Sequence, residues 1–518
     1  MPRRASGATK DSTRPVTRRT GGADGLVIGV DSSTQSTTAV VVEIATGRVR
    51  ATESAPHEVR GESGARESDP ESWWRALAGA VGAALAASGA PPAAVRGIAV
   101  AGQQHGLVVL DRAGAPLRPA MLWNDTRAAP QAAALAEALG GPGGWADRTG
   151  SAPVAAVTAA KWRWLTEHEP RTAAATAAVR LPHDYLTERL AGTAATDPGD
   201  ASGTCWYATA TGAYDPAVLD LIGLDARLLP PVAAGGGIRV GDLTPAAAAA
   251  LGLPEGIAVA AGTGDNMAAA VGLGLGAAGL MDHPVLSLGT SGTVYTVTRA
   301  RPATPALSGF ASADGHHLPL ACTLNCTLAV DRVAALLGLS RDTAEAGGEV
   351  VLLPFLDGER TPDLPTASGL LTGLRHSTSR QQILGAAYEG AVVTVLRALD
   401  TVLAVGGPAP ASPQAATRPL RLIGGGARGP YWVETVRRLA GRPVLLPRTA
   451  EPVAVGAAAL AASAAGEGDA VALARAWERT REEAAGGVRE LPAVERDRET
   501  WERVSGVLDR ATPALLRP

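Results

Sequence analysis

Leu26-Val-Ile-Gly-Val-Asp-Ser-Ser-Thr-Gln-Ser-Thr-Thr-Ala-Val-Val-Val-Glu43 is the stretch from which the fold can be predicted. Two apolar runs flank a turn of small, mostly hydroxyl-bearing residues, which is typical of a β-hairpin. Such a tip offers hydroxyl and backbone N–H groups to an anion and lets the backbone approach it closely. Because tips of this composition also occur as plain turns, one hairpin alone is weak evidence for a phosphate site.

A second stretch, Val285-Leu-Ser-Leu-Gly-Thr-Ser-Gly-Thr-Val-Tyr-Thr-Val297, repeats this pattern. The copies lie about 260 residues apart, too far for a short-period solenoid. A chain of 518 residues is also too long for one core, so two large domains are expected. Strands alternate with helical patterns in both halves. We therefore predict an α/β protein in which two similar lobes close on one nucleotide.

The domain limits follow from composition. Residues 1–24 are rich in Arg, Ser, Thr and Gly, without the apolar run of a secretory signal or the amphipathic stripe of a transit peptide. We predict a disordered tail there, a first domain over 25–276 and a second over 277–518. The longest weakly polar stretch, Gly256–Met281, contains polar residues and many glycines, and is a poor candidate for a membrane span.

Charge and cysteine content favour a cytoplasmic enzyme. A net charge of −3 and a pI near 6.3 argue against a nucleic-acid or anionic-membrane surface. Three cysteines are too few for a disulfide framework and indicate a reducing compartment. A hydrophobic content of 46% and a mean hydropathy of +0.09 fit a well-buried globular enzyme.

Lysine and asparagine are almost absent from this Arg- and Ala-rich chain, which makes the survivors informative. The lysines are Lys10 and Lys161, and the asparagines are Asn124, Asn266 and Asn325. A bias of this kind removes both residue types wherever another serves, so Lys161, Asn124 and Asn266 become functional candidates. Survival by chance is the alternative for each.

Two aspartates occupy positions suited to phosphoryl chemistry. Asp31 ends the first apolar run, where a carboxylate needs Mg²⁺ or water between itself and a phosphate; an Asx-turn role is the alternative. Asp265 lies in Gly262-Thr-Gly-Asp-Asn266, beyond a predicted strand. It could accept a proton from an attacking hydroxyl while Asn266 holds a neighbouring one. Capping of a helix over 267–274 explains one of these two residues more easily than both.

Other polar residues favour a polyol site. Gln104 and His105 lie in a turn between two predicted strands, although a lone His is more often structural. Trp123 precedes a polar cluster of the kind common in sugar pockets, but Asp125 and Arg127 equally fit a structural ion pair. We also expect Leu107–Asp111 to pair with the strand Val95–Ala101, and a hairpin near Thr193–Tyr207.

Gly424-Gly-Gly-Ala-Arg428, between a predicted strand and helix, is typical of a turn that approaches a nucleotide. It is neither a P-loop nor a dinucleotide fingerprint. A metal site formed by cysteines and histidines is not expected, because the cysteine spacing also fits one buried helix face. The residues concerned are Cys322, Cys326, His316 and His317.

The chain resembles the FGGY carbohydrate kinases of the actin-like ATPase superfamily, and among them the bacterial group that phosphorylates D-xylulose. The resemblance runs from about Leu26 to about Ala465. The motifs that carry it are Gly29-Val-Asp31-Ser-Ser-Thr34, Ala101-Gly-Gln-Gln-His105-Gly106, Leu122-Trp-Asn-Asp125, Ala160-Lys161-Trp-Arg-Trp164-Leu165, Leu181-Pro-His-Asp-Tyr185-Leu186, Gly264-Asp265-Asn266, Leu286-Ser-Leu-Gly-Thr-Ser-Gly292, Leu353-Pro-Phe-Leu-Asp-Gly-Glu-Arg-Thr-Pro362, Ile423-Gly-Gly-Gly-Ala-Arg428 and Glu451-Pro-Val-Ala-Val-Gly456-Ala457-Ala458.

This resemblance implies two actin-like (ribonuclease H-like) domains with ATP and sugar in the cleft between them. Asp265 would accept the proton of the sugar's 5-hydroxyl, and Asp31 would act near Mg²⁺, directly or through water. The expected cofactors are ATP and Mg²⁺ and the expected partner is a sugar, without nucleic acid or membrane; a homodimer is left open. Sugar contacts would come from Gln104, His105, Trp123, Asp265 and Asn266. Nucleotide contacts would come from Ser33, Thr34, Gly289, Thr290, Ser291, Gly425 and Gly426.

Two positions depart from the family pattern. Thr38 stands where the family usually has Lys or Arg facing the phosphates, and Gln104 stands where it usually has Met, which leaves the exact sugar open. Glycerol kinases carry Asn-Gln-Arg-Glu where this chain has Gly102-Gln-Gln-His105, which counts against glycerol. The alternatives are a kinase for another ketose or polyol, or an actin-like nucleotide-binding regulator without catalysis. A regulator would not need a proton acceptor such as Asp265.

Overall fold

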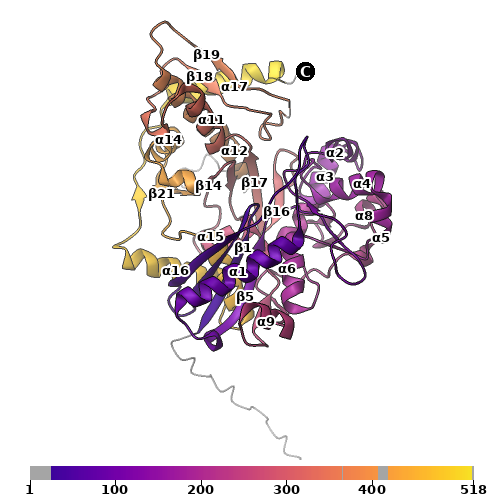
Figure 1. Ribbon diagram of the computed structural model, residues 1–518. Helices are drawn as coiled ribbons and strands as arrows, with labels where there is room; N and C mark the ends of the chain where they lie inside the picture. Colours follow the sequence, from indigo (N-terminus) through magenta and orange to yellow (C-terminus); the bar gives the residue numbers. More distant parts are fainter. Residues whose placement is uncertain (1–24, 365, 406–417, 516–518) are drawn as a thin grey trace, which may run out of the picture.

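The computed structural model describes residues 25–364, 366–405 and 418–515, and the tail over 1–24 lies outside them. Within these ranges, two seven-stranded sheets lie in two lobes (Figure 1). The first has the order β11-β12-β5-β1-β2-β3, with β13 paired to β5. Its strands are β1 (Leu26–Ser32), β2 (Ser36–Glu43), β3 (Val49–Pro56), β5 (Val95–Gly102), β11 (Arg239–Asp242), β12 (Ala258–Ala260) and β13 (Thr263–Gly264).

The second sheet has the order β16-β17-β15-β14-β20-β21-β22. Its strands are β14 (Val285–Leu288), β15 (Gly292–Tyr295), β16 (Ser308–Ala311), β17 (His317–Thr323), β20 (Leu420–Ile423), β21 (Val444–Leu445) and β22 (Glu490–Leu491). In both sheets an antiparallel hairpin, β1-β2 or β14-β15, is joined by its first strand to a parallel neighbour, β5 or β20. The predicted pair of phosphate hairpins therefore occupies equivalent places in the two lobes.

The first hairpin illustrates how the local sequence determines the strands. Asp31 faces Thr38 across the ladder. The side chains of Ile28 and Val30 enter one buried cluster, and Val27 enters another on the opposite face. This alternation is the period of two expected for a strand buried on both faces.

Helices cover both faces of the first sheet. On one face lie α1 (Pro70–Ser88), α6 (Pro182–Ala191) and α9 (Pro245–Leu251). Asp69 caps α1 by accepting a bond from the Glu71 N–H, and Pro70 is its first residue, as the sequence predicts. A satellite region of the same lobe contains α2 (Ala129–Ala136), α3 (Gly141–Thr149), α4 (Thr158–His168), α5 (Pro170–Ala175), α7 (Pro198–Ala201) and α8 (Pro216–Ile222).

The opposite face of the first sheet is covered by a helix from far along the chain. This helix, α15 (Pro452–Ala464), follows the strands of the second sheet, yet it packs on β1, β5 and α10 (Asp265–Gly272) (Figure 1). A Cβ added at Gly29 would lie 1.9 Å from the Ala454 carbonyl oxygen, and one at Gly456 would lie 1.8 Å from that of Ala268. Helix α15 therefore sits against strand and helix backbones with no space for larger side chains. The domain limits at 25–276 and 277–518 stay a prediction.

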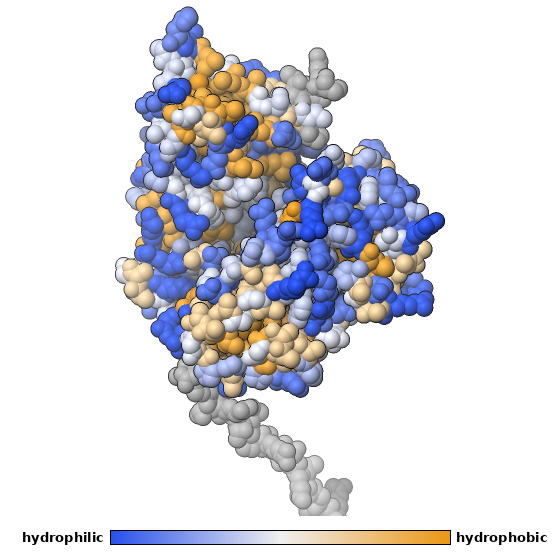
Figure 2. Space-filling view, viewed as in Figure 1, coloured by the Kyte–Doolittle hydropathy of each residue, from blue (hydrophilic) through white to orange (hydrophobic). Residues whose placement is uncertain are grey.

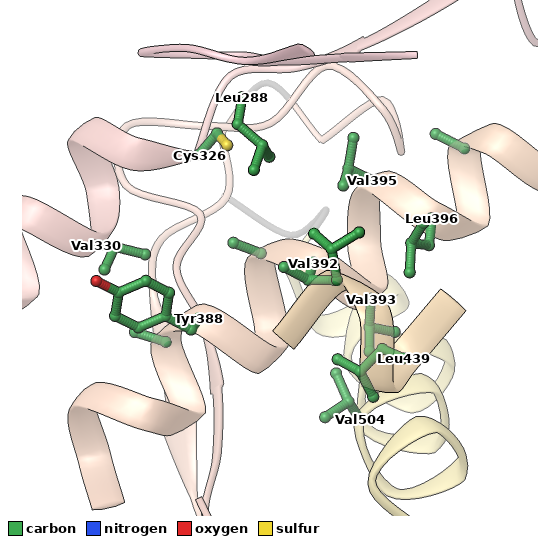
Figure 3. Close-up of a cluster of buried hydrophobic side chains, with 14 of the residues drawn as sticks. Leu288, Cys326, Val330, Tyr388, Val392, Val393, Val395, Leu396, Leu439 and Val504 are labelled. Atoms are coloured by element: carbon green, nitrogen blue, oxygen red, sulfur yellow. The ribbon is translucent and has the colours of Figure 1, made fainter. Parts of the chain in front are cut away.

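The core of the second lobe surrounds α12 (Arg380–Ala404), whose side chains are buried along most of its length (Figure 3). Val392, Val393 and Leu396 lie beside Leu439 and Val504 from two neighbouring helices. The helices of this lobe also include α11 (Thr327–Leu337), α14 (Pro430–Ala440), α16 (Ala470–Ala484) and α17 (Arg498–Leu515). A small hairpin, β18 (Val351–Leu353) with β19 (Leu370–Thr372), packs against α12.

Two pairing predictions are wrong. The run at Leu107–Asp111 forms β6 (Val108–Leu110), which pairs with β8 (Ala178–Arg180) and not with β5. Strand β5 already has β1 and β12 as parallel neighbours, so the polar turn after it leads the chain out of the sheet. The hairpin lies at β9 (Tyr207–Ala208) and β10 (Ala213–Tyr214), because Asp197 caps α7 inside the predicted range. A two-stranded ladder of β4 (Glu67–Ser68) and β7 (Ala120–Met121) completes the first lobe.

Candidate active site

Two cavities between the lobes meet at Asp265 and Asn266. The smaller, of about 170 Å³, is lined by residues of both lobes, and the larger, of about 520 Å³, extends along β20 towards α15. The space-filling view shows the surface hollowed between the lobes (Figure 2). We call these the inner cavity and the nucleotide-side cavity. The inner cavity is lined by Thr34, Gln104, His105, Trp123, Asp265, Asn266, Ser291, Thr293, Phe310, Leu320, Cys322 and Arg360.

Asp265 is the first residue of α10 and directly follows β13. Its Oδ1 accepts bonds from the backbone N–H of Asn266 at 2.7 Å and from its side-chain amide at 2.9 Å, so Oδ2 is left to accept a proton from a bound hydroxyl. Burial, with the nearby charges of Asp31 and Asp200, raises the pKa of Asp265 to about 7. A carboxylate with such a pKa is well matched to a general base near neutral pH.

Gln104 is held towards Asp265 through Asn266. The Asn266 side-chain amide donates to Gln104 Oε1 at 3.1 Å, so Gln104 presents a fixed Nε2 donor. That Nε2 atom is buried and finds no acceptor among the residues that the structure describes. A buried donor without a partner costs free energy, which a bound sugar oxygen would recover.

His105 enters the inner cavity from a residue with a φ of +66°, a backbone region that non-glycine residues rarely occupy. Its Nδ1 lies 2.7 Å from the Gly203 carbonyl oxygen, which can only accept, so Nδ1 carries the proton and Nε2 is an acceptor. Burial, with the charges of Lys161 and Arg360, lowers the pKa of His105 to about 3. The imidazole is therefore neutral at physiological pH.

Lys161 holds the backbone at His105 in place. Its fully buried ammonium group donates to the His105 carbonyl oxygen at 2.9 Å and also to that of Ala156. Burial lowers the pKa of Lys161 to about 7. The lysine singled out by its rarity therefore positions the unusual backbone at His105 and does not line the inner cavity.

Trp123 and its neighbours divide between the cavity and the scaffold. The Trp123 indole N–H donates to Thr34 Oγ1 at 3.0 Å, and both residues line the inner cavity. Asp125 pairs with Arg127 at 2.6 Å, the structural ion pair considered as the alternative. Asn124 Oδ1 is buried without a partner among the described residues, and Asn124 lines neither cavity.

The residues expected to contact the nucleotide do not all line the same cavity. Ser33 and Gly425 line the nucleotide-side cavity, whereas Thr34 and Ser291 line the inner one. Gly289 closes the second hairpin by donating its N–H to the Ser291 carbonyl at 3.0 Å. Thr290 lines neither cavity. Gly426 also lies outside the nucleotide-side cavity, packed against Leu288 and Thr327.

Asp31 lies at the end of β1 with Ser33 as its hydroxyl partner at 2.7 Å. Burial raises the pKa of Asp31 to about 6, and the charge of Glu451 adds to the rise. Thr38, opposite Asp31, contacts the hydroxyl of Ser54 at 2.8 Å and lines neither cavity. Arginines supply positive charge on the nucleotide-side cavity, namely Arg428, Arg448 and Arg489.

Reasoning from individual residues missed part of the lining. Thr293, Phe310 and Cys322 come from strands of the second sheet, and Arg360 from the loop after β18. The rarity of asparagine could have pointed to this loop. Asn325 holds it by accepting a hydrogen bond from the Leu356 N–H and donating one to the Gly358 carbonyl.

Two sheets in two lobes, with cavities between them that meet at a buried carboxylate, are the arrangement of a sugar kinase, and comparison with known proteins agrees. The FGGY family of carbohydrate kinases matches over residues 26–272 with its N-terminal domain and over 285–465 with its C-terminal domain. The chain belongs to this family and is a carbohydrate kinase that uses ATP.

Its similarity is strong to xylulose kinases. The chain is 57% identical to the xylulose kinase of Streptomyces coelicolor over 496 residues, which cover 95% of this chain and 98% of that protein. It is 56% identical, with the same coverage, to the xylulose kinase of Streptomyces rubiginosus. The solved xylulose kinase of Bifidobacterium adolescentis is 31% identical and matches with a TM-score of 0.75 over 94% of this chain and 99% of that one.

Proposed function

We propose that this kinase transfers the terminal phosphoryl group of ATP to O5 of D-xylulose. The observation that carries the proposal is the meeting of the two cavities at Asp265, which has a raised pKa and a free carboxylate oxygen. The xylulose kinases of two Streptomyces species support the choice of sugar, since they match nearly the whole chain.

Asp265 acts as the proton acceptor. With the sugar in the inner cavity, Oδ2 takes the proton of the 5-hydroxyl as its oxygen attacks the phosphoryl group, and Asn266 keeps Oδ1 engaged. Gln104 donates and His105 accepts at the sugar hydroxyls, and Trp123 covers them. Phosphoryl transfer needs little covalent help, so holding the hydroxyl in line contributes most of the rate.

The ATP phosphates lie between the two hairpin tips. Ser33 and Thr34 approach from the first tip, and Gly289, Thr290 and Ser291 form the second. Gly425 lines the cavity at its nucleoside end, and Gly426 lies behind it, packed against Leu288. Helix α15 and the arginines of the nucleotide-side cavity form its outer wall. Closure of the domains at 25–276 and 277–518 would exclude water and limit ATP hydrolysis.

The residues around Asp31 fit Mg²⁺. No arginine or lysine pairs with Asp31 among the residues described, and the nearby charges of Asp265 and Glu451 are also negative. Mg²⁺ binds carboxylate and phosphate oxygens together and would supply positive charge beside Asp31. Asp31 would hold it, directly or through water, and Ser33 fixes the carboxylate that does so.

We also infer a cytoplasmic location, which agrees with the reducing compartment that the three cysteines indicate. No helix in the described part of the chain is long and apolar enough to cross a membrane.

A substrate panel tests the assignment. We expect kcat/KM to be higher for the ketopentoses D-xylulose, D-ribulose and L-ribulose than for glycerol, because Gln104 and His105 replace the Arg-Glu pair that glycerol kinases carry. Among the ketopentoses we expect D-xylulose to be preferred, since the matching Streptomyces proteins are xylulose kinases. The measurement is steady-state formation of ADP with each sugar. An optimum with a ribulose would mean a kinase of another ketose, and a glycerol optimum would refute the proposal.

Thr38→Lys should improve the enzyme. Thr38 faces Asp31, for which the described part of the chain offers no cationic partner, so a lysine there would add positive charge beside the phosphates. We expect tighter ATP binding or a higher kcat by about 1 kcal/mol, roughly fivefold. ATP Kd by calorimetry and steady-state kcat measure this. Thr38→Gln, similar in length but uncharged, is the control and should change neither. No gain with Lys would mean that the arginines of the nucleotide-side cavity already compensate.

A further inference from the structure

Arg360 is the cation that lines the inner cavity, and the site described so far gives it no role. It comes from the loop after β18 in the second lobe, whereas Gln104, His105 and Asp265 come from the first. No residue in the described ranges accepts a hydrogen bond from its guanidinium or forms an ion pair with it. A half-buried guanidinium with free donors is set to meet a ligand.

Hydrogen bonds from Glu359 and Asn325 hold residues 356–360, the part of the loop that carries Arg360. Glu359, 1% exposed, accepts bonds from the N–H groups of Leu324, Asn325 and Arg360, at 2.5, 3.3 and 2.8 Å. Asn325 donates to the Gly358 carbonyl at 2.7 Å and accepts from the Leu356 N–H at 3.0 Å. Because these bonds lie within the protein, binding through Arg360 costs little ordering of the residues beside it.

Arg360 lies at the end of the inner cavity away from the transferred phosphoryl group. At one end, Asp265 and Asn266 border the nucleotide-side cavity. At the other, His105, Phe310, Leu320, Cys322 and Arg360 border a third cavity of about 650 Å³ that opens between the lobes. The charge of Arg360 acts on His105 and Lys161, whereas the charges that act on Asp265 are those of Asp31 and Asp200.

We propose that Arg360 donates hydrogen bonds to the carbonyl end of the bound sugar and is a residue by which this kinase prefers a ketose to the corresponding polyol. This rests on the proposed function, because O5 at Asp265 places C1 and C2 of D-xylulose towards His105 and Arg360. A carbonyl oxygen can only accept hydrogen bonds. The Arg360 guanidinium offers it several charged N–H donors, whereas the neighbouring Nε2 of His105 is an acceptor and cannot bind it. A hydroxyl at C2 can turn its own proton to such an acceptor and depends less on the guanidinium.

The test compares D-xylulose with the alcohols formed by reducing its carbonyl, xylitol and D-arabinitol. Arg360→Met should lower kcat/KM for D-xylulose about 10- to 100-fold, the range for loss of a charge-assisted hydrogen bond. The value for the alcohols should change less than about threefold, so the ketose preference falls at least about tenfold. Where an alcohol is not phosphorylated, its Ki against D-xylulose replaces kcat/KM. Arg360→Lys should recover part of the preference, and the KM for ATP should stay within twofold.

Arg397→Met is the matched control. Arg397 lines the third cavity but is paired with Asp509 at 2.7 Å, so its replacement should leave the ketose preference unchanged. Equal losses with ketose and alcohols in Arg360→Met, at an unchanged urea midpoint, would overturn the inference, as would an unchanged preference. These results leave the proposed function intact, whereas a wild-type protein that phosphorylates no ketose would overturn both.

Discussion

Asp265→Asn is expected to lower kcat by roughly 10²- to 10⁴-fold while ATP still binds. The amide keeps the size of the side chain and can still meet Asn266, but it cannot accept the proton of the attacking hydroxyl. Single-turnover kinetics and ATP calorimetry separate the two effects. A variant with near-normal turnover would remove Asp265 from the role of base.

The pH dependence of kcat/KM also tests the Asp265 carboxylate. Burial raises the pKa of Asp265 to about 7, and only the carboxylate form can act as base. The kcat/KM of the wild type should therefore fall as the pH drops below about 7, and Asp265→Asn should lose this limb. Asp225→Asn, an exposed carboxylate outside both cavities, is the control and should keep the wild-type profile.

Gly456→Val is expected to lower the free energy of unfolding by about 3 kcal/mol or more. The Cβ would lie 1.8 Å from the Ala268 carbonyl oxygen and 2.9 Å from the Gly272 nitrogen. Both are backbone atoms of α10, so no side chain can turn aside, and α15 would have to move off the helix that carries Asp265. The shift in urea midpoint, followed by circular dichroism and by tryptophan fluorescence, measures the loss.

Gly82→Val is the matched control for this effect. Gly82 is also inside a helix, α1, but a Cβ added there meets no atom within 4 Å. Its stability should stay within about 0.5 kcal/mol of the wild type, since valine costs slightly less than glycine in a helix. If both variants lose the same amount, the intrinsic preference of valine and not the close approach of α15 would be the cause.

Much of the fold could be predicted because its signals are local. In the hairpins at Leu26–Glu43 and Val285–Val297, successive apolar residues of each strand point to opposite faces of the sheet, and each hairpin has a polar tip. The place of Asp265 in the cavities was predictable for a similar reason, because the glycine before it and the asparagine after it leave few structural explanations for a carboxylate; its role as base stays a prediction. The placement of β6 was not, since a three-residue apolar strand fits several partners equally well.

The place of Arg360 in the cavity could not be predicted from the sequence. A composition that removes lysine and asparagine makes Lys161 and Asn266 conspicuous, but it uses arginine in place of lysine, and many arginines of the described residues are exposed. Only the three-dimensional arrangement separates the guanidinium of Arg360, which lines the cavity and has no partner among the described residues, from paired ones such as those of Arg127 and Arg397. The position of α15 could not be predicted either. Its small residues indicate an ordinary apolar helix, and their close contact with other backbones is seen only in the structure.

The position of α15 has a consequence for biosynthesis. All strands of the first sheet are made by Gly264, but the helix that covers the face of Val27 and Ala99 is made only after nearly the whole second lobe. On the ribosome, that apolar face must stay open until residues 452–464 emerge, so the amino-terminal lobe cannot finish folding as an independent unit. A gene truncated after the first lobe should therefore yield an aggregating product, and recombination cannot exchange the two lobes as separate modules.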